Sequence, residues 1–280
     1  MTVDAIVVSF NTRVLLRASL ASLRASRYPI HRVFVVDNAS VDGSAQMVAA
    51  EFPDVMLVEM SENLGFAQAN NAAFEHCEAD ALLLLNSDAE LSPDTLGELM
   101  TSLTADDRIG VVGPVLLGDD GLVQYEGGRR DPTILGEFGN ISHLNTRLPH
   151  SVFGRYLMNE WDHRSTRDVD VLSGACMLIR TSALRGRLFC ADFFMYGEDI
   201  ELCQRLRADG WRMRYVGTAQ VAHRGGAASQ KARAKMRVAG VVSMAQLLRR
   251  TRGPLYSVGY AAIVPIAWPL GSVIRKAWPK

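Results

Sequence analysis

The sequence predicts an α/β protein with a mostly parallel central sheet, followed by a helical tail of basic and apolar residues. Two observations predict it: short apolar runs alternate with segments of helical periodicity, and polar clusters end the apolar runs. The clearest strand is 81–85, where alanine and four leucines form an unbroken apolar run. Such a run is typical of a strand buried on both faces of a parallel sheet. It ends at Asn86, Ser87 and Asp88, where we expect ligand contacts.

The other elements of the first half follow the same alternation. We expect strands at 3–9, 32–36, 55–60 and 109–112, and helices at 12–25, 45–52, 65–77 and 94–103. Ser92 as N-cap and Pro93 as first helical residue start the last of these helices, which leaves Asp88 on a loop and available to a ligand. Right-handed βαβ units bring the carboxyl ends of parallel strands to one edge. That edge collects Ser9, Asn11, Asp37, Asn38, Asn63, Asn86 and Asp88.

The second half of the domain has a less regular pattern. A hairpin is expected at 115–128, because Asp119, Asp120 and Gly121 form a strong turn signal between apolar runs. Residues 136–167 show no clear period and predict a long loop over the site. A strand follows at 168–180, interrupted by Ser173 and Gly174.

The charge balance is strongly asymmetric along the chain. The 280 residues include 30 Lys and Arg and 30 Asp and Glu. The 71 residues after Asp209 include 13 Lys and Arg but no Asp or Glu. This predicts a tail that faces phosphates or a membrane surface. The four cysteines are widely spaced, which favours a reduced, cytosolic protein, and no export signal precedes the first strand.

The tail divides into two segments. Residues 229–250 predict an amphipathic helix, and 255–274 run for 20 residues without a charge. Pro265 and Pro269 argue against a straight transmembrane helix. Flanking bases favour a segment lying in the membrane interface, with Trp268 and Trp278 at headgroup level; the alternative is a buried structural tail.

A second chemical centre is expected near the start of a helix that ends before Gly210. Glu198 and Asp199 fall in its first turn, after Gly197 and an aromatic cluster. They could simply complement the helix dipole. A carboxylate at a helix start is also ionised near neutral pH, which suits a base that accepts a hydroxyl proton.

Six motifs in order carry a resemblance to a known family. They are Ser9-Phe-Asn11, Asp37-Asn-Ala-Ser-Val-Asp-Gly-Ser44, Asn63-Leu-Gly-Phe-Ala-Gln-Ala-Asn-Asn71, Leu85-Asn-Ser-Asp88, Ser173-Gly-Ala175 and Tyr196-Gly-Glu-Asp-Ile-Glu-Leu202. Over residues 3–223 the chain resembles the inverting family 2 glycosyltransferases of the GT-A fold, especially their rhamnosyltransferase-like branch. The resemblance implies a GT-A domain at 1–228, with a nucleotide-sugar half at 1–114 and an acceptor half at 115–228, and a membrane-associating tail at 229–280.

The resemblance also implies roles for the donor residues. Asp37 reads the edge of a pyrimidine, and the full nucleotide-sugar set is Ser9, Asn11, Asp37, Asn38, Asn63, Gly65, Asn70, Asn86, Ser87 and Asp88. Asp88 matches the last acid of the family's Asp-x-Asp motif, whereas Asn86 replaces the first acid and removes one charge. His223 matches a histidine that completes the metal site, although a lone histidine after a strand is more often structural. Oxygen ligands and a diphosphate favour Mg²⁺ or Mn²⁺.

On the acceptor side, the resemblance makes Asp199 the general base and Glu198 the residue that orients the acceptor, with Gly174 and Trp161 also in acceptor binding. The implied reaction is a single in-line displacement with inversion, because one base and no opposing nucleophile are present. A sugar nucleotidyltransferase or a dinucleotide oxidoreductase is disfavoured, since no glycine-rich loop follows the first strand.

The expected partners follow from the same resemblance. The best expectation is transfer of rhamnose from dTDP-rhamnose to a hydroxyl of a glycan or lipid-diphosphate-linked saccharide, in cell-surface polysaccharide synthesis. Such an enzyme would lie in the cytoplasm on the anionic inner face of the cell membrane, and no nucleic-acid partner is expected. The alternatives are a UDP-hexose or UDP-galactofuranose donor, or a non-catalytic subunit that binds nucleotide-sugars.

Overall fold

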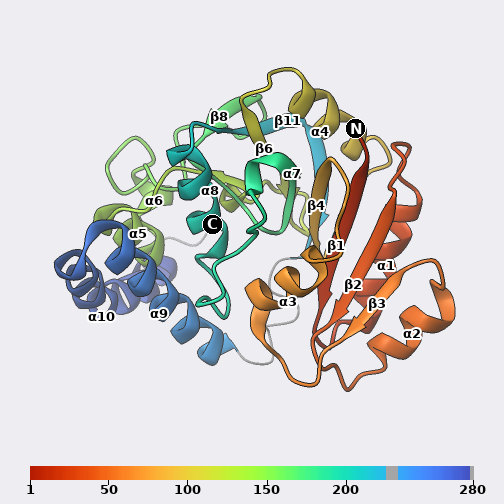
Figure 1. The fold of residues 1–280 in the computed structure, drawn as a ribbon. Helices are drawn as coiled ribbons and strands as arrows, with labels where there is room; N and C mark the ends of the chain where they lie inside the picture. The colour runs from red at the N-terminus through yellow and green to blue at the C-terminus, as the bar shows by residue number, and fades with distance from the viewer. Residues whose placement is uncertain (225–232, 278–280) are drawn as a thin grey trace.

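The computed structural model describes residues 1–224 and 233–277, and its centre is a nine-stranded sheet. Four strands from the first half, β1 (Val3–Ser9), β2 (Arg32–Asp37), β3 (Met56–Glu59) and β4 (Ala81–Asn86), run parallel in the order β3-β2-β1-β4 (Figure 1). The register pairs Ser9 with Asp37 and Val8 with Asn86. The polar ends of these strands therefore lie at one edge, as predicted.

The second half of the chain completes the sheet beyond β4. β10 (Cys176–Arg180) lies antiparallel between β4 and β6 (Ile109–Leu117), and β11 (Arg212–His223) runs parallel to β6. β5 (Ala89–Leu91) and β8 (Arg167–Val169) pair antiparallel with β11. A separate two-stranded sheet joins β7 (Gly128–Arg129) to β9 (Val171–Leu172). The prediction of a mostly parallel α/β sheet is confirmed.

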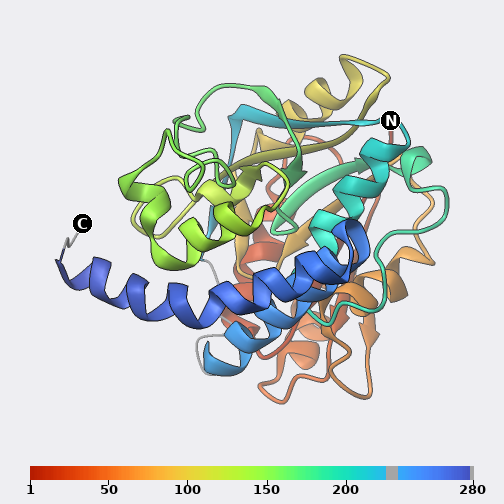
Figure 2. The same ribbon diagram turned by 90° about the vertical axis from the view of Figure 1, so that its left-hand side faces the viewer.

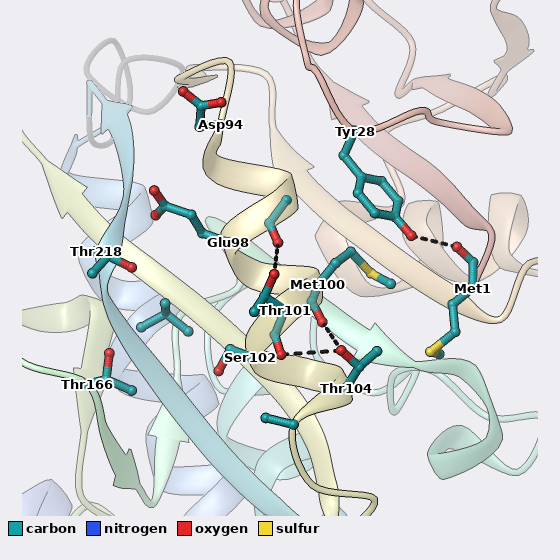
Figure 3. A pocket seen from close by; sticks show the side chains of 13 residues that line it. Met1, Tyr28, Asp94, Glu98, Met100, Thr101, Ser102, Thr104, Thr166 and Thr218 are labelled. Carbon is teal, nitrogen blue, oxygen red and sulfur yellow. Dashed lines mark hydrogen bonds between the residues drawn. The ribbon is translucent and has the colours of Figure 1, made fainter.

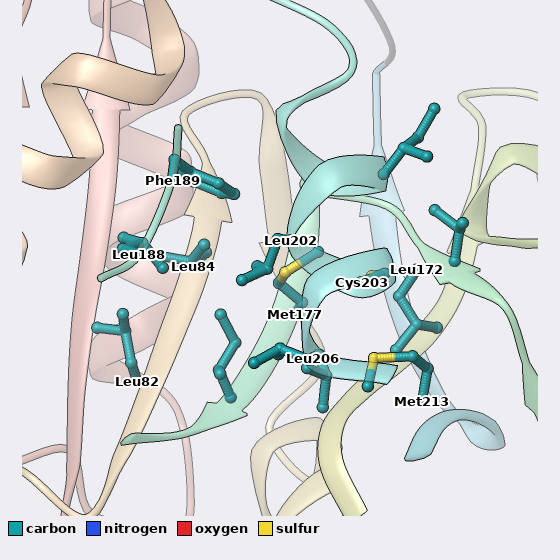
Figure 4. Close-up of a cluster of buried hydrophobic side chains, with 14 of the residues drawn as sticks. Leu82, Leu84, Leu172, Met177, Leu188, Phe189, Leu202, Cys203, Leu206 and Met213 are labelled. Carbon is teal, nitrogen blue, oxygen red and sulfur yellow. The ribbon is translucent and has the colours of Figure 1, made fainter. Parts of the chain in front are cut away.

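Helices cover both faces of the sheet. One face packs against α1 (Arg13–Arg24), α2 (Ser44–Glu51) and α4 (Thr95–Thr104), and the other against α3 (Gly65–Phe74), α7 (Thr181–Leu184) and α8 (Glu198–Ala208). The leucines of β4 alternate between the two cores: Leu83 and Leu85 join the first, Leu82 and Leu84 the second. Figure 4 shows Leu82 and Leu84 on the side of the sheet that α8 covers. Burial on both faces explains the unbroken apolar run.

A group of helices flanks the α8 side of the sheet. α10 (Pro254–Ala277) packs along α9 (Arg233–Arg252) and α5 (Ile134–Ser142), and α6 (Leu144–Arg147) follows α5 (Figure 2). Leu248, Tyr260 and Val264 form the buried core of this group. α9 and α10 are therefore attached to the rest of the chain through an apolar core that they share with α5.

The predicted loop at 136–167 is wrong in its first part, because α5 and α6 occupy residues 134–147. The hydroxyl of Thr133 caps α5 by accepting the amide of Gly136 at 3.0 Å. The apolar side of α5 packs against α10, more than 100 residues later in the sequence. A helix stabilised by so distant a partner has a weak local signal.

Three smaller expectations also change. The turn at Asp119–Gly121 is present, but only one bridge, between Leu117 and Val123, continues it as a hairpin among the described residues. The helix expected from residue 94 begins at Thr95, and β5 precedes it. α10 continues through Pro265 and Pro269, whose rings lie on its exposed side, where water can bond to the freed carbonyl groups.

The structure describes some of the predicted domain boundaries and not others. β6 passes through residue 114, so the two expected halves share one sheet. The expected start of the tail at 229 and the headgroup role of Trp278 lie outside the described residues. The division into a domain and a tail stays a prediction.

Candidate active site

Asp37 is the last residue of β2, and only one oxygen of its buried carboxylate has a hydrogen-bond partner among the described residues. Its side chain is 3% exposed, and Oδ2 accepts the amide of Ser40 at 2.9 Å. Oδ1 has no partner within the described part of the chain. A buried acceptor without a donor costs roughly 1–3 kcal/mol, so a ligand N–H is the natural partner for this oxygen. The N3–H of uracil or thymine is such a donor.

Asn11 shapes the loop beside Asp37. It has a φ of 55°, and its side-chain oxygen accepts the amide of Val41 at 2.8 Å. Its own amide donates to the hydroxyl of Ser40 at 2.9 Å. Asn11 therefore ties the loop after β1 to the loop after β2, at the wall of the expected base pocket.

Three hydroxyl groups connect the ends of β1 and β4. Ser9 is fully buried, and its Oγ lies 2.9 Å from Oγ1 of Thr12, which in turn donates to Oγ of Ser87 at 2.9 Å. These linked hydroxyl groups hold the loop that carries Ser87 and Asp88 against β1. Thr12 is a member of this group that sequence reasoning missed.

Asn38 organises the loop before α3. Its side-chain amide donates to Oδ1 of Asn63 at 2.9 Å and to the carbonyl of Gly65 at 3.1 Å, and its oxygen accepts the amide of Leu64 at 3.0 Å. Asn70 is likewise buried, and it donates to the carbonyl of Phe66 one turn earlier. Both asparagines thus support the expected donor site through the backbone.

Gly65 lies where the donor loop meets the loop before α8. Its φ is +82°, and a Cβ at this position would come within 2.1 Å of the carbonyl oxygen of Phe194. The amide of Phe66 donates to the same oxygen at 2.8 Å. Only glycine fits here, so the sequence at 65 fixes a direct contact between the two halves of the site.

His223, at the end of β11, reaches the loop after β4. Its Nε2 lies 3.5 Å from Oδ1 of Asp88 and 3.5 Å from the amide nitrogen of Asn86. The structure thus brings together the residues that were predicted to hold a metal. The described residues contain no group of three or more His, Cys, Asp and Glu side chains around one point.

Gln124 sets the tautomer of His223. Its Nε2 donates to the backbone carbonyl of His223 at 2.8 Å, which directs its Oε1 to the ring Nδ1 at 2.7 Å. An amide oxygen only accepts, so Nδ1 carries the proton and Nε2 presents a lone pair. A histidine held in this way would suit, together with Asp88, a divalent cation. The sequence has no signal for Gln124.

Asp199 is held by three donors in the first turn of α8. Its Oδ1 accepts the amide of Ile200 at 2.8 Å, and its Oδ2 accepts the amide of Gly174 at 3.3 Å and the guanidinium of Arg129. Asp199 is 8% exposed. A Cβ on Gly174 would lie 3.4 Å from the ring of Phe66 and 3.6 Å from Cβ of Asp199. Gly174 therefore lies between the donor loop and the predicted base.

Glu198, the residue before Asp199, is a buried carboxyl group. It is 5% exposed, and burial, followed by the charge of Asp199, raises its pKa to about 8. Its Oε2 has no partner among the described residues. A buried carboxyl group with a raised pKa suits a hydrogen-bond donor beside the predicted base.

Trp161 lies in an aromatic cluster around Tyr215. Its ring stacks on His163 at 4.1 Å between centroids and meets Tyr215 edge-on at 5.0 Å. Burial lowers the pKa of His163 to about 4, so its ring is neutral in this cluster. Acceptor binding by Trp161 stays a prediction.

A hollow of about 820 Å³ lies at the opposite edge of the sheet. Met1, Tyr28 and Glu98 are among the residues that line it (Figure 3). Met1 precedes β1, so this hollow is at the amino ends of the strands and away from Asp37, Asp88 and Asp199. It contains none of the predicted site residues.

Polar side chains at the carboxyl ends of a parallel sheet mark the ligand-binding edge of an open α/β protein. The family model described as glycosyl transferase family 2 matches residues 4–187. The chain belongs to this family, and it is a glycosyltransferase, as the sequence predicts.

Relatives of known name agree with this assignment. The chain is 31% identical over 232 residues to the N-acetylglucosaminyl-diphospho-decaprenol L-rhamnosyltransferase of Mycobacterium tuberculosis, with 78% of this chain and 74% of that protein covered. It is 33% identical to the O-antigen biosynthesis protein RfbC of Myxococcus xanthus, with 77% of this chain and 16% of that protein covered.

Solved structures share the fold. The mannosyltransferase PcManGT from Pyrobaculum calidifontis, in complex with GDP-Man and Mn²⁺, superposes with a TM-score of 0.63 at 20% identity, covering 99% of this chain and 74% of that one. S. aureus TarS 1-349 in complex with UDP-GlcNAc gives a TM-score of 0.55 at 14% identity, covering 99% and 92%. The GT-A prediction for the fold is confirmed.

Proposed function

We propose that the protein transfers rhamnose from dTDP-rhamnose to a hydroxyl of a lipid-diphosphate-linked saccharide at the cytoplasmic face of the cell membrane, in cell-surface polysaccharide synthesis. The observation that carries the proposal is the likeness to the M. tuberculosis rhamnosyltransferase, which extends over 78% of this chain. That protein's name specifies a rhamnosyl group and a lipid-diphosphate acceptor. The anionic acceptor also suits the basic character of the residues after Asp209.

Asp37 supports a pyrimidine nucleotide. Its buried Oδ1 lacks a donor within the described chain, and thymine and uracil both offer one N–H at the corresponding edge. A UDP-hexose or UDP-galactofuranose donor therefore remains the second candidate.

Asp199 acts as the general base in this proposal. It accepts the proton of the acceptor hydroxyl while that oxygen bonds to the anomeric carbon and the nucleoside diphosphate departs with the bonding electrons. Asp88 and His223 would hold Mg²⁺ or Mn²⁺, which would supply positive charge against the diphosphate. Glu198, whose pKa is raised to about 8, is protonated at neutral pH and donates a hydrogen bond to the acceptor.

The exposed face of α10 supports membrane association. Pro254–Lys276 is long and apolar enough to span a membrane, but the face with Tyr260, Val264 and Ala267 is buried against the domain. The opposite face exposes a row of apolar side chains: Leu255 (87% exposed), Val258 (66%), Ile266 (62%) and Val273 (61%). A helix with one face in protein and one apolar face outside fits an interfacial position. Arg252, Arg275 and Lys276 at its ends suit anionic headgroups.

The decisive experiment measures nucleotide release and product mass with purified full-length protein. The donors are dTDP-rhamnose, UDP-glucose and UDP-galactofuranose, and the acceptor is a polyprenyl-diphosphate N-acetylglucosamine in vesicles, with Mg²⁺, Mn²⁺ or a chelator. Metal-dependent release of dTDP together with a rhamnosylated lipid is the expected result. Transfer from a UDP-sugar alone would replace the proposed donor. Donor binding without transfer to any acceptor would support a non-catalytic nucleotide-sugar-binding subunit.

A further inference from the structure

We propose that Arg129 is the positioning residue of Asp199: its buried guanidinium fixes one oxygen of the carboxylate and leaves the other directed at the acceptor. The inference rests on the proposed role of Asp199 as the base. Arg129 has no place in the motifs from which the site was predicted, and it lies 70 residues earlier in the chain.

Arg129 is itself held rigidly. β7 pairs with β9 through Gly128–Leu172 and Arg129–Val171, and the carbonyl of Arg129 accepts the amide of Asp170 at 3.1 Å. A Cβ on Gly128 would come within 2.7 Å of the Tyr215 ring, so the strand packs directly on that side chain. The side chains of Arg129 and Asp199 are each 12% exposed. A fixed backbone and a buried ion pair restrict the rotamer of Asp199.

The donors divide the carboxylate into two unequal oxygens. Oδ2 is occupied by Arg129 and the amide of Gly174, whereas Oδ1 accepts the amide of Ile200 alone. A carboxylate oxygen has two lone-pair directions, so Oδ1 keeps one for a proton. The acceptor O–H bond breaks toward that lone pair, while the acceptor oxygen bonds to the anomeric carbon and the nucleoside diphosphate leaves with its electron pair.

The charges around Asp199 explain why an arginine is needed. The titratable groups that face Asp199 or the Arg129 beside it are Glu198 and Cys203 from α8, Glu137 from α5, Tyr156, Glu126 and Arg129 itself. Arg129 is the cation of this group. Burial is the largest single influence and opposes its charge, but the interactions with Asp199, Tyr156, Glu126 and Cys203 together raise the pKa of Arg129 above its ordinary value. Removing a neighbouring cation disfavours the ionised form of a carboxylate, so the loss of Arg129 is expected to affect the charge of the proposed base as well as its position.

A buried ion pair could instead serve stability alone. The two roles differ in the pH dependence of the reaction. A positioning cation keeps the base ionised, so its loss moves the acid limb of the kcat/KM profile to higher pH. A structural pair, once lost, lowers the melting temperature and the amount of folded enzyme without moving that limb.

The test compares Arg129→Gln, Arg129→Lys and the matched control Arg130→Gln. Arg130 is the next residue, and it forms a 3.3 Å ion pair with Glu160 on the surface, with 41% of its side chain exposed. We expect Arg129→Gln to lose roughly 10²-fold in kcat/KM at neutral pH and to recover part of it toward about pH 9. Arg129→Lys keeps a charge without the planar fork, so it should retain more activity and an acid limb near that of the wild type. Arg130→Gln should change kcat/KM by less than about twofold.

Nucleotide binding by calorimetry and the melting temperature are measured for each variant. An Arg129→Gln profile that is lowered equally at every pH, with Arg129→Lys no better, would overturn the proposal, and so would an unchanged rate. A double-mutant cycle with Asp199→Asn separates the two assignments. If Arg129 acts through Asp199, adding Arg129→Gln to Asp199→Asn should lower kcat/KM little further. If Asp199→Asn is itself fully active, the proposed base is wrong, whatever the arginine does.

Discussion

The donor side and the acceptor side of the site are assembled in different ways. On the donor side, Ser9, Asp37 and Asn86 each end a parallel strand, and the register of β1 with β2 and β4 brings them to one edge. On the acceptor side, Asp199 in α8 is held by Gly174 after β9 and by Arg129 in β7. The donor side thus follows from the sheet, and the acceptor side from contacts between distant segments.

The two sides also differ in electrostatics. At the donor edge, Oδ1 of Asp37 has no hydrogen-bond donor among the described residues. Asp88 lies beside His223, whose Nε2 has a lone pair. On the acceptor side, the carboxylate of Asp199 is held by a cation and two amides, and one of its oxygens keeps a lone pair for a proton. One side is therefore built to receive ligand atoms, and the other to hold a reactive group at a fixed angle.

The contact between the sides is short and rigid. The carbonyl of Phe194 accepts the amide of Phe66, and the side chain of Asn71 bonds to the backbone of Phe189 through both its amide and its oxygen. Behind this loop, the hydroxyl of Ser243 in α9 donates to the carbonyl of Met195 at 2.8 Å. The loop before α8 is thereby held between the donor loop and the helices of the tail.

The largest effect is expected from the base. Asp199→Asn should lower transfer by roughly 10²-fold or more while donor binding persists, because the amide cannot take the hydroxyl proton. Glu198→Gln is the matched control: a carboxyl whose pKa is raised to about 8 is mostly neutral at pH 7, and glutamine resembles that neutral form. Steady-state rates and donor titrations measure both. Equal losses in the two variants would remove the distinction between the neighbouring acids.

The next largest effect concerns the metal ligands of the donor side. Asp88→Ala should abolish metal-dependent donor binding in calorimetry and leave binding of the free nucleoside nearly unchanged. Gln124→Leu, which removes the partner of His223 Nδ1, should weaken metal affinity by about 10- to 100-fold. Thr101→Val on α4 is a surface control that removes only a bond within that helix. Donor binding by Asp88→Ala that still needs the metal would contradict the assignment.

The sequence predicted where the strand-end residues of the donor side lie, because each of them follows a strand with a strong apolar pattern, and their roles in binding stay predictions. Once the strands are parallel, their carboxyl ends must share an edge, so Ser9, Asp37, Asn86 and Asp88 meet without any further information. The leucines of β4 and the glycine at 65 are local signals of the same kind. The parallel core and its polar edge were therefore predictable.

The acceptor side was predicted only in part, for a physical reason. Asp199 has a local signal at a helix start, but Arg129 acts through a partner 70 residues away. On the donor side, Gln124 likewise acts through a partner 99 residues away. Such pairs leave no periodicity in the sequence. α5 was missed for the same reason, because its apolar side is covered by α10. Tertiary contacts, rather than propensity, stabilise these elements.

A moderate effect is expected on membrane binding. Val258→Glu combined with Ile266→Glu places two charges on the exposed face of α10, where the side chains are 66% and 62% exposed, so the fold should be retained. Two lost apolar contacts should weaken binding to anionic vesicles by about tenfold or more. Val14→Glu, at a 73% exposed position on α1, is the control. Salt-sensitive pelleting is the readout, and equal pelleting of all three proteins would exclude this face as the anchor.

The smallest effect on activity is expected at Glu137, which tests whether the buried charges behind the acceptor side matter for folding. Burial raises the pKa of Glu137 from 4.5 to about 7, although Arg129 and Tyr156 partly oppose the shift. The folded protein thus binds this proton more tightly than the unfolded chain. Its contribution to stability is present below pH 4.5 and is lost as the pH rises through about 7.

Between those values the free energy of unfolding should fall by about 3 kcal/mol through this group. Glu137→Gln removes the titration, so urea unfolding at a series of pH values should give a flatter profile than the wild type. Glu75→Gln, at an exposed position after α3, should keep the wild-type slope. Transfer at neutral pH should change less than about twofold in both variants, since Arg129 still holds Asp199. A Glu137→Gln profile as steep as that of the wild type would place the pH-dependent stability elsewhere in the acceptor half.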